Sequence, residues 1–278
     1  MNSSLKFYFD QAQNLSIDHQ WISRDFDFFL NAIGIASTTI ALKDDLEISS
    51  ETISSVNNFF TSYVEGIPLD YILNTSSFLD FTFYVDPRVL IPRPETELIV
   101  EKVIDFAINK NAVVLDVGTG SGCIAISLAM LRPDLKIFAS DISSDALDVA
   151  TINIQNHQVN NMQLIKSNWL SYAKTESLDL VMSNPPYLKS DDMHLKNLAH
   201  EPQSALVSPK GTKSFLEISQ QAFIALKHGG RIIFEHGFSQ RLEVTAILKD
   251  CGFKNIISGP VLQGFYIFIY APQTCKIF

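Results

Sequence analysis

Residues 112–131 read AVVLDVGTGSGCIAISLAML, an apolar run, a glycine-rich turn and a second apolar run. The first run, 112–117, has the length and β-branched composition of a buried strand. The second follows glycines at 118, 120 and 122 and opens a helix. Such glycines let the backbone approach a ligand, and the helix start offers free N–H groups to an anionic group. This unit predicts an α/β domain with a ligand site at the turn.

The alternation of strand and helix continues beyond this unit. Seven strands are predicted, at 112–117, 136–140, 162–166, 178–183, 231–236, 255–259 and 265–271. Helical stretches separate most of them, which indicates a doubly wound, mostly parallel seven-stranded sheet with helices on both faces. The last two strands are joined only by PVLQG, 260–264. Because this link is too short for a parallel crossover, an antiparallel hairpin is expected at one edge of the sheet.

Residues 1–75 are predicted to form a small helical domain. The stretch 21–35 places apolar residues at helical spacing, and 49–68 repeats the pattern between a serine cap, Ser49 or Ser50, and Gly66. No catalytic pattern lies on these helices. A docking module and a packing appendage therefore remain equally open.

Residues 76–92 are predicted to be a β-hairpin linker, because aromatic and β-branched residues flank the turn Asp86-Pro87. The domain 93–278 then starts with a helix near Pro94. Glu95 and Glu97 fall in the first turn of that helix, where the helix dipole favours negative charge. Helix initiation explains both glutamates without any chemistry.

Composition limits the possible functions. The 278 residues are 46% apolar and 18% charged, which is typical of a globular protein. A net charge of −9 argues against nucleic acid as a direct partner. Cys123, Cys251 and Cys275 form no pattern typical of disulfides or zinc. Apolar runs are too short for a membrane span, and no secretory signal is recognised, so a cytoplasmic location is expected.

The glycine turn differs from a dinucleotide site. A GxGxxG fingerprint would need glycine at position 123, where this chain has Cys123. The GxGxG spacing suits a ligand with a carboxylate and a sulfonium better than a diphosphate. The expected ligand-binding residues of the turn are Gly118, Thr119, Gly120, Ser121 and Gly122.

Two further ligand contacts are expected at the same edge of the sheet. Asp141 ends the second strand, where an acidic side chain accepts both ribose hydroxyls of a nucleoside. A helix cap is the alternative role, although Ser143 or Ser144 could serve it equally well. Asn168 and Trp169 follow the third strand. Trp169 could cover an adenine face, with Asn168 pairing to its edge, or Trp169 could simply pack.

The stretch 178–187, LDLVMSNPPY, ends an apolar strand at Asn184 and continues with Pro185, Pro186 and Tyr187. Proline restricts the residue before it and fixes the backbone after it, so the Asn184 side chain and nearby carbonyls are held in one arrangement. The Asn184 oxygen and the Pro185 carbonyl could each accept an N–H of an amide or amine. They would thus hold its nitrogen while it takes a methyl group, with Tyr187 stacking on the planar acceptor.

The chain resembles the release factor glutamine methyltransferases, which are class I methyltransferases that use S-adenosylmethionine. The resemblance rests on segments in family order: GIPLDYI, VLIPRPETE, LDVGTGSGCIAISLA, SDISSDALDVA, DLVMSNPPY, EPQSAL and GGRIIFEHGFSQ. It implies that residues 118–122, Asp141, Trp169 and Asn184 bind S-adenosylmethionine, with S-adenosylhomocysteine as product. It also implies that residues 184–187 grip the glutamine of a Gly-Gly-Gln motif in a peptide chain release factor, which the helical domain helps to dock.

The sequence departs from the family pattern at three places. Asn168 stands where the family usually has an acidic residue. The glycine-rich turn expected after EPQSAL reads SPKGTKSF, and the usual arginine before the last strand is replaced within PVLQGFYIF.

Other functions explain less of the sequence. NPPY would also suit a DNA adenine amino-methyltransferase, but no basic target-reading domain is present. A glutamine methyltransferase of a ribosomal protein is a closer alternative, and a nucleoside-binding protein without chemistry belongs to another class. The acidic and histidine residues at 191–201 match no usual metal-ligand spacing, and no GxSxG motif indicates a hydrolase.

Overall fold

The computed structural model describes residues 5–35, 48–106, 108–259, 261–262, 265–266 and 268–272. The chain divides into two compact units, Met1–Thr75 and Ser76–Phe278. Cys275 and parts of the predicted PVLQG connection lie outside the described residues.

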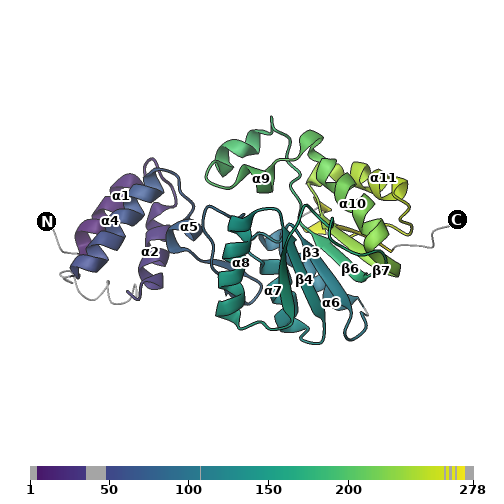
Figure 1. Ribbon diagram of the computed structural model, residues 1–278. Coiled ribbons are helices and arrows are strands. Elements are labelled where there is room, and N and C mark those ends of the chain that lie inside the picture. Colours follow the sequence, from purple (N-terminus) through teal and green to yellow (C-terminus); the bar gives the residue numbers. More distant parts are fainter. Residues whose placement is uncertain are drawn as a thin grey trace. The chain divides into compact units, whose positions relative to one another are not determined.

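The first unit is helical (Figure 1). Its described helices are α1 (Leu5–Leu15), α2 (Ile22–Ala32), α4 (Ser50–Val64) and α5 (Leu69–Leu73). Ser49 caps α4, because its hydroxyl oxygen accepts the Thr52 N–H at 3.1 Å. An aromatic core joins α2 to α4, with the Phe26 ring centroid 5.3 Å from that of Phe59 and 4.9 Å from that of Phe60. Packed aromatic rings thus hold these short helices together.

The second unit contains a seven-stranded sheet with the order β5–β4–β3–β6–β7–β11–β8. Its strands are β3 (Val113–Val117), β4 (Lys136–Asp141), β5 (Met162–Lys166), β6 (Leu178–Ser183), β7 (Leu226–Glu235), β8 (Ile257–Ser258) and β11 (Phe268–Pro272). Strands β3 to β7 are parallel, and β11 runs antiparallel to both β7 and β8. The predicted doubly wound sheet with an antiparallel pair at its edge is confirmed. A short hairpin, β9 (Val261–Leu262) with β10 (Phe265–Tyr266), lies between β8 and β11 in the chain.

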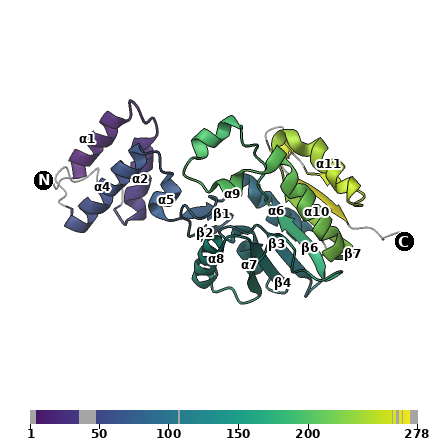
Figure 2. The ribbon, with the colours of Figure 1, turned by 45° about the horizontal axis from the view of Figure 1, so that its top comes forward.

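Helices cover both faces of the sheet (Figures 1 and 2). One face packs against α6 (Pro94–Asp105), α7 (Cys123–Leu131) and α8 (Ser144–His157), and the other against α10 (Lys213–Ala225) and α11 (Arg241–Asp250). Along β6, Leu180 and Met182 join the first core, and Val181 joins the second. Burial of both faces explains why the strands read as continuous apolar runs.

The strand order reverses between β3 and β6. Strands β4 and β5 continue the sheet on one side of β3, and β6 and β7 continue it on the other. The loops after Val117 and Ser183 leave the same edge, where the Ser183 hydroxyl donates to the Val117 carbonyl oxygen at 2.6 Å. Open α/β sheets bind their ligands at such a reversal, outside the carboxyl ends of the strands.

The hairpin of the second unit differs from the sequence prediction. It is formed by β1 (Ser76–Phe78) and β2 (Phe81–Phe83), so it turns at Leu79 and Asp80 rather than at Asp86-Pro87. The Asp86 carboxylate instead accepts the Arg88 backbone N–H at 3.0 Å, which forms a separate local turn after the hairpin. The predicted position of the hairpin turn was therefore wrong.

Gly122 joins the glycine turn to α7 in a conformation that requires glycine. Its φ is +84°, and a Cβ placed there would lie 2.9 Å from Ile126 Cδ1. We expect Gly122→Ala to lower the free energy of unfolding by about 2 kcal/mol, measured by urea denaturation, because left-handed backbone alone costs roughly 1–2 kcal/mol. Gly229→Ala is the matched control, because Gly229 has φ +79° and no atom within 4 Å of the added Cβ. Equal losses in both variants would contradict a cost from the Ile126 contact.

No helix in the described part of the chain is long and apolar enough to cross a membrane. Within the same residues, no group of three or more His, Cys, Asp or Glu side chains is arranged to hold a metal ion. Cys123 and Cys251 are free thiols.

Candidate active site

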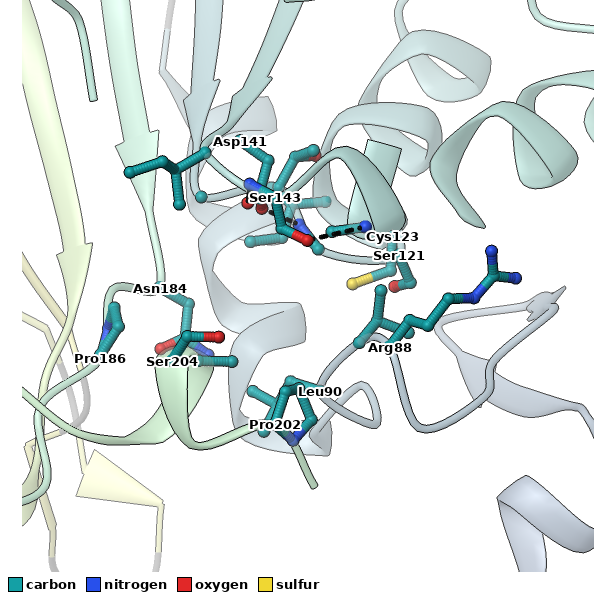
Figure 3. Close-up of a pocket in the computed structure, with 18 of the residues that line it drawn as sticks. Arg88, Leu90, Ser121, Cys123, Asp141, Ser143, Asn184, Pro186, Pro202 and Ser204 are labelled. Carbon is teal, nitrogen blue, oxygen red and sulfur yellow. Dashed lines mark hydrogen bonds between the residues drawn. The ribbon is translucent and has the colours of Figure 1, made fainter. Parts of the chain in front are cut away.

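A cavity lies at the carboxyl edge of the sheet, between the glycine turn and the ends of β4 and β6 (Figure 3). The space opens to solvent on one side and measures about 960 Å³ with that open solvent included. The predicted residues that line it are Gly118, Thr119, Gly120, Ser121, Asp141, Trp169, Asn184 and Pro186. Gly122 does not line this cavity; it is the N-cap residue that precedes α7.

Backbone hydrogen bonds shape the glycine turn. The N–H groups of Gly118 and Thr119 donate to the Ser140 carbonyl oxygen at 2.8 and 3.0 Å. Gly118 and Gly120 have φ values of +72° and +55°. A Cβ on Gly120 would have no atom within 4 Å, so this backbone borders open space in the cavity. The turn therefore allows a ligand to contact the main chain directly.

Asp141 is held rigidly at the end of β4. Its Oδ2 accepts the Gly120 N–H at 3.0 Å and its Oδ1 accepts the Ser143 N–H at 2.9 Å. Burial raises the pKa of Asp141, and these backbone hydrogen bonds oppose that rise. The cap of α8 is Ser143, whose hydroxyl oxygen accepts the Ala146 N–H. The cap role that the sequence left open for Asp141 thus belongs to Ser143.

Trp169 packs against the core and also lies at the cavity. Its ring packs against the core beneath α10, and the residue also lines the cavity together with Asn168. Its Nε1–H donates to Glu217 Oε2 at 2.8 Å, which fixes the ring plane. Trp169 Cζ3 would be the nearest atom, at 3.8 Å, to a Cβ on Gly118. The indole therefore forms a fixed wall beside the glycine turn.

Asn184 lies between two cavities. A second cavity is lined mainly by apolar side chains together with Asn184, Arg93, Tyr187 and His194. Asn184 lines both cavities. Two ligands bound in the two spaces would meet beside its carboxamide. The arrangement suits transfer of a group from one ligand to the other.

The other members of the NPPY stretch have different surroundings. Pro186 lines the first cavity, and Tyr187 lines the second. Pro185 is buried and lines neither. Gln240 holds the loop, because its Nε2 donates to the Tyr187 carbonyl oxygen at 2.9 Å. The backbone around Asn184 is thus fixed by both proline rings and this hydrogen bond.

Polar side chains form a buried network behind Asn184. The Asn184 Nδ2 donates to Thr96 Oγ1 at 3.0 Å, and the Thr96 hydroxyl donates to Glu235 Oε2 at 2.5 Å. The Tyr187 hydroxyl donates to Glu235 Oε1 at 3.3 Å. Burial raises the pKa of Glu235 to about 7, and the hydrogen bonds from Thr96, Tyr187 and Asn184 oppose that rise.

The comparisons with known proteins agree with this geometry. Residues 95–234 match the family model described as "Methyltransferase small domain". A release factor glutamine methyltransferase of Shewanella oneidensis is 37% identical over 69% of this chain and 68% of that protein. The relative of that name in Escherichia coli strain K12 is 32% identical over 84% of this chain and 86% of that protein.

The chain belongs to the release factor glutamine methyltransferase family. The protein is therefore a methyltransferase, as the sequence predicted. A crystal structure of a methyltransferase from Pyrococcus furiosus aligns with a TM-score of 0.54 over 82% of this chain and all of that one. At 14% identity, that alignment shows a shared fold.

Two residues near the cavities were not recognised from sequence. Thr96 stands between Glu95 and Glu97, which the sequence assigned to helix initiation, and Glu235 ends an apolar strand. The signal available for Glu235 was its place at the carboxyl end of the strand beside β6. Nothing in the local sequence pattern of Thr96 indicated its contact with Asn184.

An ion pair between a buried carboxylate, that of Glu201, and the half-buried Arg93 connects two of the segments that resemble the family. Glu201 accepts the Ile91 N–H at 3.1 Å and a guanidinium N–H of Arg93 at 2.5 Å. Arg93 lines both cavities. The Glu201 carboxylate therefore fixes the position of Arg93 beside the second cavity.

Proposed function

We propose that this protein transfers a methyl group from S-adenosylmethionine to the side-chain amide nitrogen of a glutamine, the one in the Gly-Gly-Gln motif of peptide chain release factors. The observation that carries this proposal is the position of Asn184, whose carboxamide borders both cavities at the end of β6. Membership of the release factor glutamine methyltransferase family favours glutamine over other acceptors with an N–H.

The first cavity fits S-adenosylmethionine. The unobstructed backbone at Gly120 admits the amino acid part, the Asp141 carboxylate has lone pairs left for ribose hydroxyls, and the Trp169 ring forms a wall for adenine. Thr119, Ser121 and Asn184 are among the other polar residues of the lining. When bound, S-adenosylmethionine supplies an electrophilic methyl group on a sulfonium, and S-adenosylhomocysteine is the product.

The second cavity takes the acceptor amide. An amide nitrogen is a poor nucleophile, because its lone pair is delocalised into the carbonyl. Asn184 Oδ1 and the Pro185 carbonyl oxygen each accept one N–H of the amide, which orients the nitrogen and stabilises the positive charge that develops on it as the methyl group leaves the sulfonium. The nitrogen then releases one of its two protons to water, which leaves a neutral N-methyl amide. Pro186 keeps these two acceptors in place, and Tyr187 presents a face on which the planar amide stacks.

Residues 1–75 are assigned to docking of the release factor, 76–92 to the linker and 93–278 to the methyltransferase domain. The helical unit offers exposed apolar side chains, among them Trp21 and Phe28, for a protein partner.

A substrate that acts in translation implies that the protein works in the cytoplasm. The acidic net charge favours a protein substrate over nucleic acid.

One assay tests the proposed function. The protein is mixed with methyl-labelled S-adenosylmethionine and, in separate reactions, a release factor, ribosomal proteins or adenine-containing duplex DNA. We expect label on one peptide of the release factor, and mass spectrometry should place it on the glutamine of Gly-Gly-Gln. A release factor with glutamate at that position is the control and should remain unlabelled. Label on adenine, or on ribosomal proteins alone, would replace the proposal with one of its rivals.

A further inference from the structure

A chain of hydrogen bonds runs from the sheet to the back of the Asn184 carboxamide. Glu235 ends β7 and Thr96 lies in the first turn of α6, and each is only 3% exposed. The Thr96 hydroxyl donates to Glu235 Oε2, and Asn184 Nδ2 donates to Thr96 Oγ1. Segments far apart in the sequence thus meet at the group that faces the substrate.

The direction of these hydrogen bonds is fixed by the donors available. An ionised carboxylate only accepts, so the single hydroxyl proton of Thr96 goes to Glu235. Thr96 can then only accept from Asn184, whose sole side-chain donor is its amide nitrogen. Because the carboxamide is planar and its nitrogen points to Thr96, its oxygen points away from Thr96. Within the described part of the chain, no hydrogen bond to Asn184 Oδ1 is present.

We propose that Glu235, acting through Thr96, is a positioning residue that turns the oxygen of the Asn184 carboxamide toward the substrate. This inference rests on the proposed function, because it concerns an acceptor that offers an N–H. A carboxamide turned by 180° would place its own N–H against the substrate N–H. Two donors would then face each other, and the substrate nitrogen would lose an acceptor.

Protonation of Glu235 would remove the constraint on the orientation of the Asn184 carboxamide. A neutral carboxyl group can donate to Thr96, which frees the Thr96 proton for Asn184 Oδ1 and favours the reversed carboxamide. Burial and the negative charge of Glu95 raise the pKa of Glu235 to about 7. Of the other titratable neighbours, Tyr187 and Cys123 stay neutral in this range, because burial raises the pKa of both, that of Cys123 to about 12. Arg93 contributes a positive charge near Tyr187.

The pH dependence of transfer follows from these charges. Below its pKa Glu235 is protonated and the carboxamide can reverse, whereas above its pKa the ionised carboxylate keeps the oxygen turned to the substrate. We therefore expect kcat for release factor to rise with pH through about 7. A wild-type profile that stays flat between about pH 6 and 9 would contradict the role of Glu235.

Three substitutions test the chain itself. Thr96→Val keeps the shape of the side chain and removes the hydroxyl, and we expect kcat to fall about 10- to 100-fold with S-adenosylhomocysteine affinity unchanged. Thr96→Ser keeps the hydroxyl and should restore most of kcat. Glu235→Gln still accepts from Thr96 through its amide oxygen but no longer titrates. Its profile should therefore lose the rise through pH 7 while retaining activity at low pH.

The controls separate failure of this inference from failure of the proposed function. Thr245→Val removes a hydroxyl that donates to the Arg241 carbonyl oxygen within α11, and it should leave kcat unchanged. If wild-type protein labels no glutamine, the proposed function fails. If it does label glutamine, then wild-type kcat in Thr96→Val or a retained pH rise in Glu235→Gln overturns the positioning role. If Thr96→Val does not fold, the pH profile of kcat for Glu235→Gln alone tests the positioning role.

Discussion

Asn184→Ala is expected to lower kcat for methyl transfer by roughly 10² to 10³, the cost of losing one preorganised hydrogen-bonding group at a reacting centre. The substitution removes Oδ1, the acceptor that would hold the substrate nitrogen, and Nδ2, which donates to Thr96. The two proline rings after it remain, so the loop should keep its conformation. The loss should therefore fall on kcat rather than on the fold.

Three measurements check this expectation together. Single-turnover transfer to the release factor should slow, whereas titration calorimetry with S-adenosylhomocysteine and thermal unfolding should change little. Asn109→Ala is a matched control, because Asn109 is exposed and precedes β3 at the opposite, amino end of that strand. Transfer at the wild-type rate in Asn184→Ala would remove Asn184 from the mechanism.

Local patterns were sufficient to predict the sheet and one side of the site. Parallel strands that are buried on both faces are recognisable as continuous apolar runs in the sequence. The glycine turn and Asn184-Pro185 each follow such a strand directly. Because parallel strands end at one edge, features at strand ends could be placed together without coordinates. Asp141 came from the same reasoning, and the structure puts it in the cavity beside Gly120.

The polar support behind Asn184 could not be predicted in this way. Thr96 contacts a residue 88 positions away, and Glu235 contacts Thr96 across 139 positions. Such pairs depend on how α6 packs on the sheet, whereas helix and strand periodicities report only which face is buried. The sequence also offered a sufficient local explanation for the PETE stretch, since Pro94, Glu95 and Glu97 begin the helix as expected. The helix does begin at Pro94, Glu97 also accepts the Leu79 N–H at 2.8 Å, and the local explanation gave no reason to single out Thr96.

Asp141→Ala is expected to weaken binding of S-adenosylhomocysteine about 100-fold. The carboxylate is held by the Gly120 and Ser143 N–H groups, so its orientation toward the cavity is set before a ligand arrives. Hydrogen bonds to a charged group contribute about 1.5–3 kcal/mol each, and two ribose hydroxyls make two of them. These values are already net of exchange with water, so two bonds at the lower end of the range contribute about 3 kcal/mol, or roughly two factors of ten.

The effect of Asp141→Ala should differ in kind from that of Asn184→Ala. Calorimetry should show a higher Kd, and steady-state kinetics a higher KM for S-adenosylmethionine with kcat reduced much less, because Asp141 binds ligand atoms remote from the reacting centre. Asp145→Ala removes an exposed carboxylate in the first turn of α8 and serves as the charge-matched control. Unchanged affinity in Asp141→Ala would mean that the ribose hydroxyls are bound elsewhere. The carboxylate would then serve only to hold the glycine turn through the Gly120 N–H.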